Sequence, residues 1–266
     1  MANTNTHPRA ADLFEQEALS PALRALLEPR IAEVVLAASS GDRCRLHAAE
    51  RSWADAVIAE LAIDLVIEGI DRIDPKGQYV IAPLHEGFAD VLALLRLPLD
   101  LNWVIRDELL QLPYFGEYLR MAGHIAVEPE SPRAALRSIL RDGGAMLERG
   151  ESLVVFPQGS LLGIEISFKA GAFQLAQRFD IPLLPVVLTG SHRVWEYPFA
   201  RTVRHAQSIH MEVLDPIDPT KAVAEMGRLE REMKRRALAA SHAPARHYVP
   251  DRDGIWDGYR FDVDPV

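Results

Sequence analysis

The sequence contains a single cysteine, Cys44, among its 266 residues. One thiol excludes an internal disulfide and any metal site built from several thiolates. No apolar run approaches the roughly 20 residues that a helix needs to cross a bilayer. Basic residues are also scarce, because 29 Lys and Arg stand against 38 Asp and Glu, for a net charge of −9. Proteins that bind nucleic acid usually carry the opposite surplus, so the charge argues against such a partner.

Other absences narrow the class of protein further. The 16 glycines and 18 prolines are too few and too scattered for a fibrous or disordered chain. The first residues lack the basic-then-apolar pattern of a secretory signal peptide. We therefore expect a single-core protein of the cytoplasm, with peripheral contact to the inner face of a membrane as a hypothesis. No pattern of histidines or carboxylates implies a metal ion, and none implies an organic cofactor.

Residues 1–63 are predicted to form an N-terminal helical segment. From residue 10 to about 62, apolar side chains recur at three- and four-residue spacings, which is typical of amphipathic helices. A polar break at residues 39–42 separates a second helix, expected from about His47 to Ala62. Two interpretations of this helical hairpin remain open. It covers one face of a sheet, or it dips into a lipid surface.

Residues 64–246 read as an α/β domain. Short β-rich runs alternate with helical ones, and strands joined by helices of this length form parallel pairs through right-handed crossovers. The predicted fold is a mostly parallel central sheet flanked by helices. We expect strands at residues 65–73, 79–84, 101–105, 124–127, 152–156, 183–188 and 209–214.

The clearest predicted helix runs over residues 131–149. Ser131 is placed to cap its start, Pro132 fits the first turn, and Gly150 follows its end. A last helix is expected at about 219–240. It leads into an acidic, aromatic tail over residues 247–266.

The first candidate for catalysis follows the predicted strand 79–84. Ligands of such folds bind at the carboxyl ends of the strands, which is where His85 lies. Asp90 lies five residues further on, at the start of a helix. Its carboxylate can accept a hydrogen bond from one ring nitrogen of His85, while the other nitrogen takes a proton from a hydroxyl. The same spacing recurs twice elsewhere in the chain, so the strand–turn–helix context is what singles out this pair.

Two other strand ends carry polar groups. After the strand 152–156, Gly159 would let the backbone approach a ligand, and Gln158 and Ser160 offer uncharged hydrogen bonds. Lys169 lies in a loop that enters the next helix, where a cation and backbone N–H groups can meet an anion. Arg106 ends the strand 101–105 and is expected in the same crevice as His85. Its alternative is an ion pair with a neighbouring carboxylate, that of Asp107 or Glu108.

Taken in order, these segments resemble the glycerolipid acyltransferase family, which includes lysophosphatidic-acid and glycerol-3-phosphate acyltransferases. The family's H-x4-D motif is matched by His85 and Asp90. Its second block, a basic residue before E-L, then P-x-x-G and G-x-I-x-V, is matched by Arg106, Glu108, Leu109, Pro113, Gly116 and residues 123–127. Its F-P-E-G-[ST]-R-S block is matched in part by residues 156–160, and its F-K-x-G-A and I-P-x-x-P-V blocks by 168–172 and 181–186. The resemblance covers about residues 64–190.

The chain departs from the family at three places. Gln158 stands where the third block has glutamate, and Leu161 replaces the arginine after the Ser or Thr. Glu128 and Pro129 replace the acidic-Arg pair that ends the second block. The resemblance implies that the missing cations hold the acceptor's phosphate. The acceptor is therefore open between a phosphorylated and an uncharged lipid alcohol, with Arg106 and Lys169 as candidate replacements.

The resemblance implies transfer of a fatty acyl group from a thioester, acyl-CoA or acyl carrier protein, to a lipid hydroxyl such as that of a lysophospholipid. His85 would act as general base and Asp90 would orient it. The candidate substrate-binding residues are Arg106, Phe156, Pro157, Gln158, Gly159, Ser160 and Lys169. Two alternatives remain open. The same dyad could serve a hydrolase of acyl thioesters or lipids, or the chain could be a non-catalytic lipid-binding relative.

Residues 191–246 reverse the sign of the charge, with 10 basic and 7 acidic side chains. Five of the cations fall on the last predicted helix: Arg228, Arg231, Lys234, Arg235 and Arg236. One hypothesis is that this stretch docks an anionic bilayer or an acidic acyl carrier protein. The other is a solvated helix face whose cations pair with Glu230 and Glu232.

Overall fold

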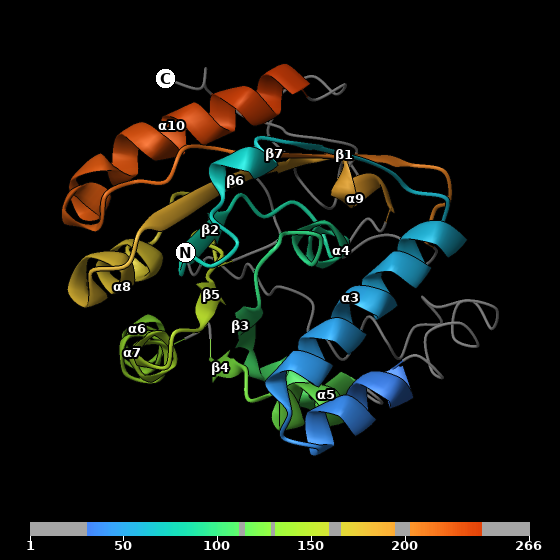
Figure 1. Cartoon of the computed structure of the whole chain (residues 1–266). Helices are drawn as coiled ribbons and strands as arrows, with labels where there is room; N and C mark the ends of the chain where they lie inside the picture. Colours follow the sequence, from blue (N-terminus) through green and yellow to red (C-terminus); the bar gives the residue numbers. More distant parts are fainter. Residues whose placement is uncertain (1–30, 112–114, 129–130, 160–165, 195–202, 241–266) are drawn as a thin grey trace, which may run out of the picture.

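The computed structural model describes residues 31–111, 115–128, 131–159, 166–194 and 203–240. Within them a seven-stranded sheet has the order β1-β7-β6-β2-β5-β3-β4 (Figure 1). Five of the six neighbouring strand pairs are parallel, and only β6 and β7 run antiparallel. The mostly parallel α/β sheet predicted from the sequence is confirmed. The strands are β1 (Asp64–Glu68), β2 (Val80–Pro83), β3 (Leu101–Arg106), β4 (Ile125–Val127), β5 (Ser152–Val154), β6 (Leu183–Thr189) and β7 (Ser208–Val213).

Each of the seven predicted strands is present, but β1 ends five residues before the predicted boundary. Gly69 follows it with a φ of 71°, and a Cβ at this position would lie 2.3 Å from the carbonyl oxygen of Val213. The chain therefore turns at Gly69 into the short 3₁₀ helix η1 (Ile70–Arg72). The apolar residues after Gly69 predict a longer strand. The strand ends earlier because β7 approaches closely at Gly69.

Helices cover both faces of the sheet (Figure 1). On one face, α8, α10 and the α6–α7 segment enclose an apolar core with Val80 and Ala82 of β2. On the other face, α3 and α4 pack with Ile81, which lies between Val80 and Ala82 in β2. Alternate residues of β2 thus point to opposite faces, as the pleat of a strand requires. The helices concerned are α3 (Arg43–Glu60), α4 (Asp90–Leu94), α6 (Pro132–Ser138), α7 (Gly144–Glu148), α8 (Gly171–Phe179) and α10 (Ala222–Ala240).

The predicted helix over residues 131–149 forms with two changes. Its middle is a π turn, η3 (Ile139–Gly143), between α6 and α7. At its start, the hydroxyl of Ser131 donates to Glu128 Oε2 at 2.7 Å and makes no capping bond, so the predicted cap is wrong. Pro132 occupies the first turn and Gly150 follows the end with a φ of 83°, both as predicted. The last predicted helix consists of η4 (Pro219–Lys221) and α10.

The described part of the N-terminal segment is a helical pair. Residues 31–39 are helical, and after a turn at residues 40–42 the chain enters α3, four residues before the predicted start. The earlier start reflects the carboxylate of Asp42, which accepts a hydrogen bond from the Arg45 N–H and caps the helix. Ala54, Val57 and Leu61 pack into the core, so this part covers a face of the sheet. Residues 1–30, like the tail 247–266, lie outside the described residues.

A buried polar network joins α3 to α5 (Phe115–Ala122). On α3, the carboxylate of Glu50 lies 2.9 Å from Nδ1 of His47 and accepts a hydrogen bond from the Tyr118 hydroxyl of α5. The Tyr118 oxygen also lies 3.0 Å from Nε2 of His124. Burial lowers the pKa of His124 to about 4, although Glu50 opposes this shift, and burial raises the pKa of Tyr118. The network therefore holds a neutral histidine at the point where the helical segment meets the sheet.

Among the described residues, no helix is both long and apolar enough to span a membrane.

Candidate active site

The predicted dyad joins the loop after β2, which carries His85, to Asp90, the first residue of α4. Nδ1 of His85 lies 2.6 Å from Oδ2 of Asp90, and the Asp90 side chain is fully buried. The same oxygen accepts the backbone N–H groups of Glu86 at 2.8 Å and Gly87 at 3.1 Å. The backbone of the loop therefore holds the Asp90 carboxylate in place. With Nδ1–H bonded to Asp90, Nε2 is the ring nitrogen that takes up a proton in the neutral tautomer.

The segment after β5 supports His85 from a second side. The Phe156 ring stacks on the His85 ring with centroids 3.7 Å apart and an interplanar angle of 21°. Gln158 is completely buried, and its Oε1 accepts the His85 N–H at 2.7 Å while its Nε2 donates to the His85 carbonyl at 3.2 Å. The sequence predicted that these residues contact a substrate. For Gln158, the structure instead places the carboxamide on the backbone of the candidate base.

The adjoining turn brings a cation to the same loop. The backbone N–H of Lys169 donates to the Pro157 carbonyl at 2.8 Å, so Lys169 lies next to the turn that follows β5. Gly159 has a φ of 61°, and a Cβ on it would lie 2.8 Å from the Lys169 ammonium. The left-handed backbone conformation favours glycine at position 159, and a larger residue would also displace the Lys169 ammonium. Lys169 is exposed, and Ser160 lies outside the described residues.

Arg106 is the last residue of β3, at the carboxyl edge of the sheet. Its guanidinium donates to Oε1 of Glu108, with Nε at 2.9 Å. Of the two readings of Arg106 left open by the sequence, the structure contains the local ion pair. Both side chains of this pair are partly exposed.

A second acid–histidine pair lies next to the dyad and was not predicted from the sequence. Glu86 and His192 are both buried, with Oε2 3.0 Å from Nδ1. The Ser191 hydroxyl also donates to Glu86 Oε2 at 3.3 Å. A Cβ on Gly87 would lie 2.9 Å from the backbone nitrogen of His192, so α9 (Ser191–Val194) packs directly on the dyad loop. His192 follows β6 closely, so the rule that functional groups follow strands could have found it.

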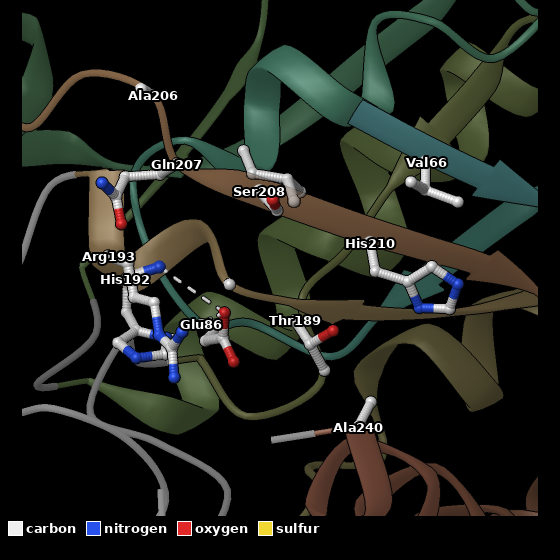
Figure 2. A pocket seen from close by; sticks show the side chains of 12 residues that line it. Val66, Glu86, Thr189, His192, Arg193, Ala206, Gln207, Ser208, His210 and Ala240 are labelled. Atoms are coloured by element: carbon white, nitrogen blue, oxygen red, sulfur yellow. Dashed lines mark hydrogen bonds and ion pairs between the residues drawn. The ribbon is translucent and has the colours of Figure 1, made fainter. Parts of the chain in front are cut away.

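Glu86 and His192 also line a pocket of about 310 Å³. Figure 2 shows them at one end of it, beside Thr189 at the end of β6, with Val66 of β1 and His210 of β7 at the other end. His85 and Asp90 do not line it. Glu86 thus connects the two: its side chain lines the pocket, and its backbone N–H donates to Asp90.

The cations of α10 are mostly paired in the structure. Arg228 pairs with Glu225 and Glu232, Lys234 with Glu230, and Arg236 with Glu212 and Glu232. Arg236 accordingly lowers the pKa of Glu232. This arrangement is the solvated, paired helix face that the sequence offered as one of two interpretations. Docking of a bilayer or a carrier protein on this helix stays a prediction.

Comparison with known proteins finds sequence relatives that share one name. Residues 64–189 match the family model described as Acyltransferase. The chain is 29% identical over 134 residues to a 1-acyl-sn-glycerol-3-phosphate acyltransferase of Cocos nucifera, covering 49% of this chain and 43% of that protein. It is 26% identical over 182 residues to the protein of that name in Pseudomonas aeruginosa, covering 65% and 68%. A Limnanthes alba relative of the same name is 27% identical over 175 residues, covering 61% of each chain.

The fold has a solved counterpart. The crystal structure of the 1-acyl-sn-glycerophosphate (LPA) acyltransferase PlsC from Thermotoga maritima superposes with a TM-score of 0.67 at 19% identity. The superposition covers 87% of this chain and 97% of that one. The sheet and its flanking helices are therefore the architecture of that protein. Together, the family model over residues 64–189 and the named relatives support the glycerolipid acyltransferase family that the sequence motifs resemble.

Proposed function

We propose that this protein transfers a fatty acyl group from a thioester to a lipid hydroxyl, with His85 as the general base. One observation carries the proposal: the 2.6 Å contact of Nδ1 with the buried carboxylate of Asp90, at the carboxyl end of β2. This arrangement is the one that stabilises an imidazolium while leaving the other nitrogen to take a proton. The relatives, named as 1-acyl-sn-glycerol-3-phosphate acyltransferases, support the substrate class.

The proposed chemistry needs no covalent enzyme intermediate. Nε2 of His85 removes the proton of the acceptor hydroxyl as that oxygen attacks the thioester carbonyl. The tetrahedral intermediate collapses with cleavage of the C–S bond. The leaving thiolate takes the proton from the imidazolium, which releases a free thiol and an ester. Asp90 stabilises the positive ring between the two proton transfers.

For the acceptor, we propose a lysophosphatidate-like lipid, whose phosphate meets Lys169 and Arg106. Lys169 supports this assignment because its exposed ammonium lies against Gly159, on the turn that also carries Phe156 and Gln158. Arg106 would have to exchange Glu108 for the phosphate. Phe156, Pro157, Gly159 and Ser160 remain proposed to border the substrate. The donor is proposed as acyl-CoA or acyl carrier protein, without a metal ion or organic cofactor.

The test is thiol release from acyl-CoA and from acyl carrier protein, with and without acceptor. H85A should lower acceptor-dependent release by about 10² to 10⁴, the usual contribution of a positioned base, and leave the circular dichroism spectrum unchanged. Retained activity in H85A would refute the base. Thiol release that needs no acceptor would assign a hydrolase instead. Absence of release with every donor and acceptor would point to a binding protein.

A further inference from the structure

The β2–β5 ladder ends before it reaches His85. Val155 donates its N–H to the Ile81 carbonyl at 2.9 Å, which is the last ladder bond toward His85 on this side of β2. The next donors in register would be Pro83 and Pro157, and proline carries no N–H. The loop that holds the candidate base therefore leaves β2 without main-chain support from β5.

The Gln158 side chain fills this gap. Its carboxamide accepts from the His85 N–H and donates to the His85 carbonyl, so it bonds both polar groups of one peptide residue. Its side chain has no exposed surface, and a buried amide that lost these partners would cost about 1–3 kcal/mol. Both bonds therefore hold the backbone of His85 at a fixed distance from β5.

The same short segment also holds the ring. Phe156 lies two residues before Gln158 and stacks on the imidazole at 3.7 Å, while Asp90 holds Nδ1 from the other side. Backbone and ring of His85 are thus both located by residues 156–158. The Gln158 carboxamide itself is directed to the backbone and not to open space.

A neutral amide makes this pair of bonds at every pH. A glutamate at position 158 could accept the His85 N–H, but its second oxygen would face the His85 carbonyl oxygen and repel it. That contact becomes favourable only when the carboxyl is protonated and can donate. Burial raises the pKa of a carboxyl group, so protonation would occur within an accessible pH range.

We propose that Gln158 is a positioning residue, which acts through the backbone of His85 to keep the imidazole in register with Asp90 and the acceptor hydroxyl. The inference rests on the proposed function, since it assigns Gln158 to the same reaction. It replaces the acceptor contact that the sequence suggested for this side chain.

The test compares Q158E and Q158M with Q78E. Gln78 is the matched control, because its Nε2 also donates to backbone carbonyls, including that of Glu151 at 2.9 Å, but it lies before β2, at the opposite end of the strand from His85. Misplacement of a catalytic group by about 1 Å costs on the order of 10²-fold in rate. We expect kcat per folded molecule to fall by about 10- to 100-fold in Q158M at all pH values, with the KM of the acceptor within about twofold.

Q158E adds a second measurement, the pH dependence of kcat, which would not change if Gln158 only stabilised the fold. Its kcat relative to the native protein should rise as the pH falls, because protonation restores the donor to the His85 carbonyl. In Q78E this ratio should stay constant with pH. If Q158E does not fold, Q158M carries the test, since it adds no charge.

Three results would overturn the proposal. They are an unchanged kcat in folded Q158M, a raised acceptor KM with unchanged kcat, and a free energy of unfolding that drops without loss of activity per folded molecule. Each differs from failure of the proposed function itself. That failure would show as activity in H85A, whatever the Gln158 variants do.

Discussion

Replacing Asp90 by asparagine removes one charge from the dyad and almost no volume. Oδ2 of Asp90 accepts three donors: Nδ1–H of His85 and the N–H groups of Glu86 and Gly87. Oδ1 is buried and has no hydrogen-bond partner among the described residues. In D90N the amide oxygen would keep the three donors, so its NH₂ group would occupy the place of Oδ1.

The expected loss of rate follows from the charge. Two unit charges about 4 Å apart attract by about 4 kcal/mol at an effective dielectric constant of 20. The imidazolium that forms in the reaction loses this stabilisation in D90N. Because each 1.36 kcal/mol is tenfold in rate, kcat should fall by about 10³-fold. Because the three donors would bond a neutral oxygen in place of a charged one, the free energy of unfolding should fall by about 1–3 kcal/mol.

The assay is acceptor-dependent thiol release, with urea unfolding of the same samples. D142N is the control, since Asp142 pairs with Arg141 at the surface and the same chemical change there should leave kcat unaltered. A fall in kcat of less than about tenfold in folded D90N would show that Asp90 does not stabilise a positive ring, and the general-base reasoning would be refuted.

Two further predictions concern other parts of the molecule. His124 is buried with a pKa of about 4, below its unfolded value, so the unfolded chain binds the extra proton and stability should fall as the pH drops through the window from 6.5 to 4. From this group, the free energy of unfolding of the native protein should fall by about 2 kcal/mol between pH 6.5 and 5, and that of H124F should not. Urea unfolding at both pH values measures this difference. An equal pH dependence in the two proteins would contradict the assignment. K169A should raise the KM of a phosphorylated acceptor on the order of tenfold, leaving an uncharged acceptor unaffected, in the thiol-release assay. An equal effect on both acceptors would remove Lys169 from phosphate binding.

Much of the fold was predictable because its signals are local. Strands such as β2 are continuous apolar runs bounded by turn residues, and Pro132 and Gly150 mark a helix start and stop within a few residues of the pattern they bound. The errors have tertiary causes. Strand β1 stops at Gly69 because the Val213 carbonyl of β7 approaches from across the sheet, and no local pattern reports that approach.

The candidate site also has a local part, which could be predicted, and a part that depends on the tertiary structure. The resemblance to a family and the His85–Asp90 pair could be read from the sequence, because only four residues lie between the two side chains and the apolar pattern marks the strand before them. The contacts that support this pair come from distant parts of the chain and could not be predicted. Gln158 contacts His85 across 73 residues, and the Ser191 hydroxyl contacts Glu86 across 105. Such contacts depend on which strands become neighbours in the sheet, so no local pattern could show that the Gln158 carboxamide bonds the backbone of His85.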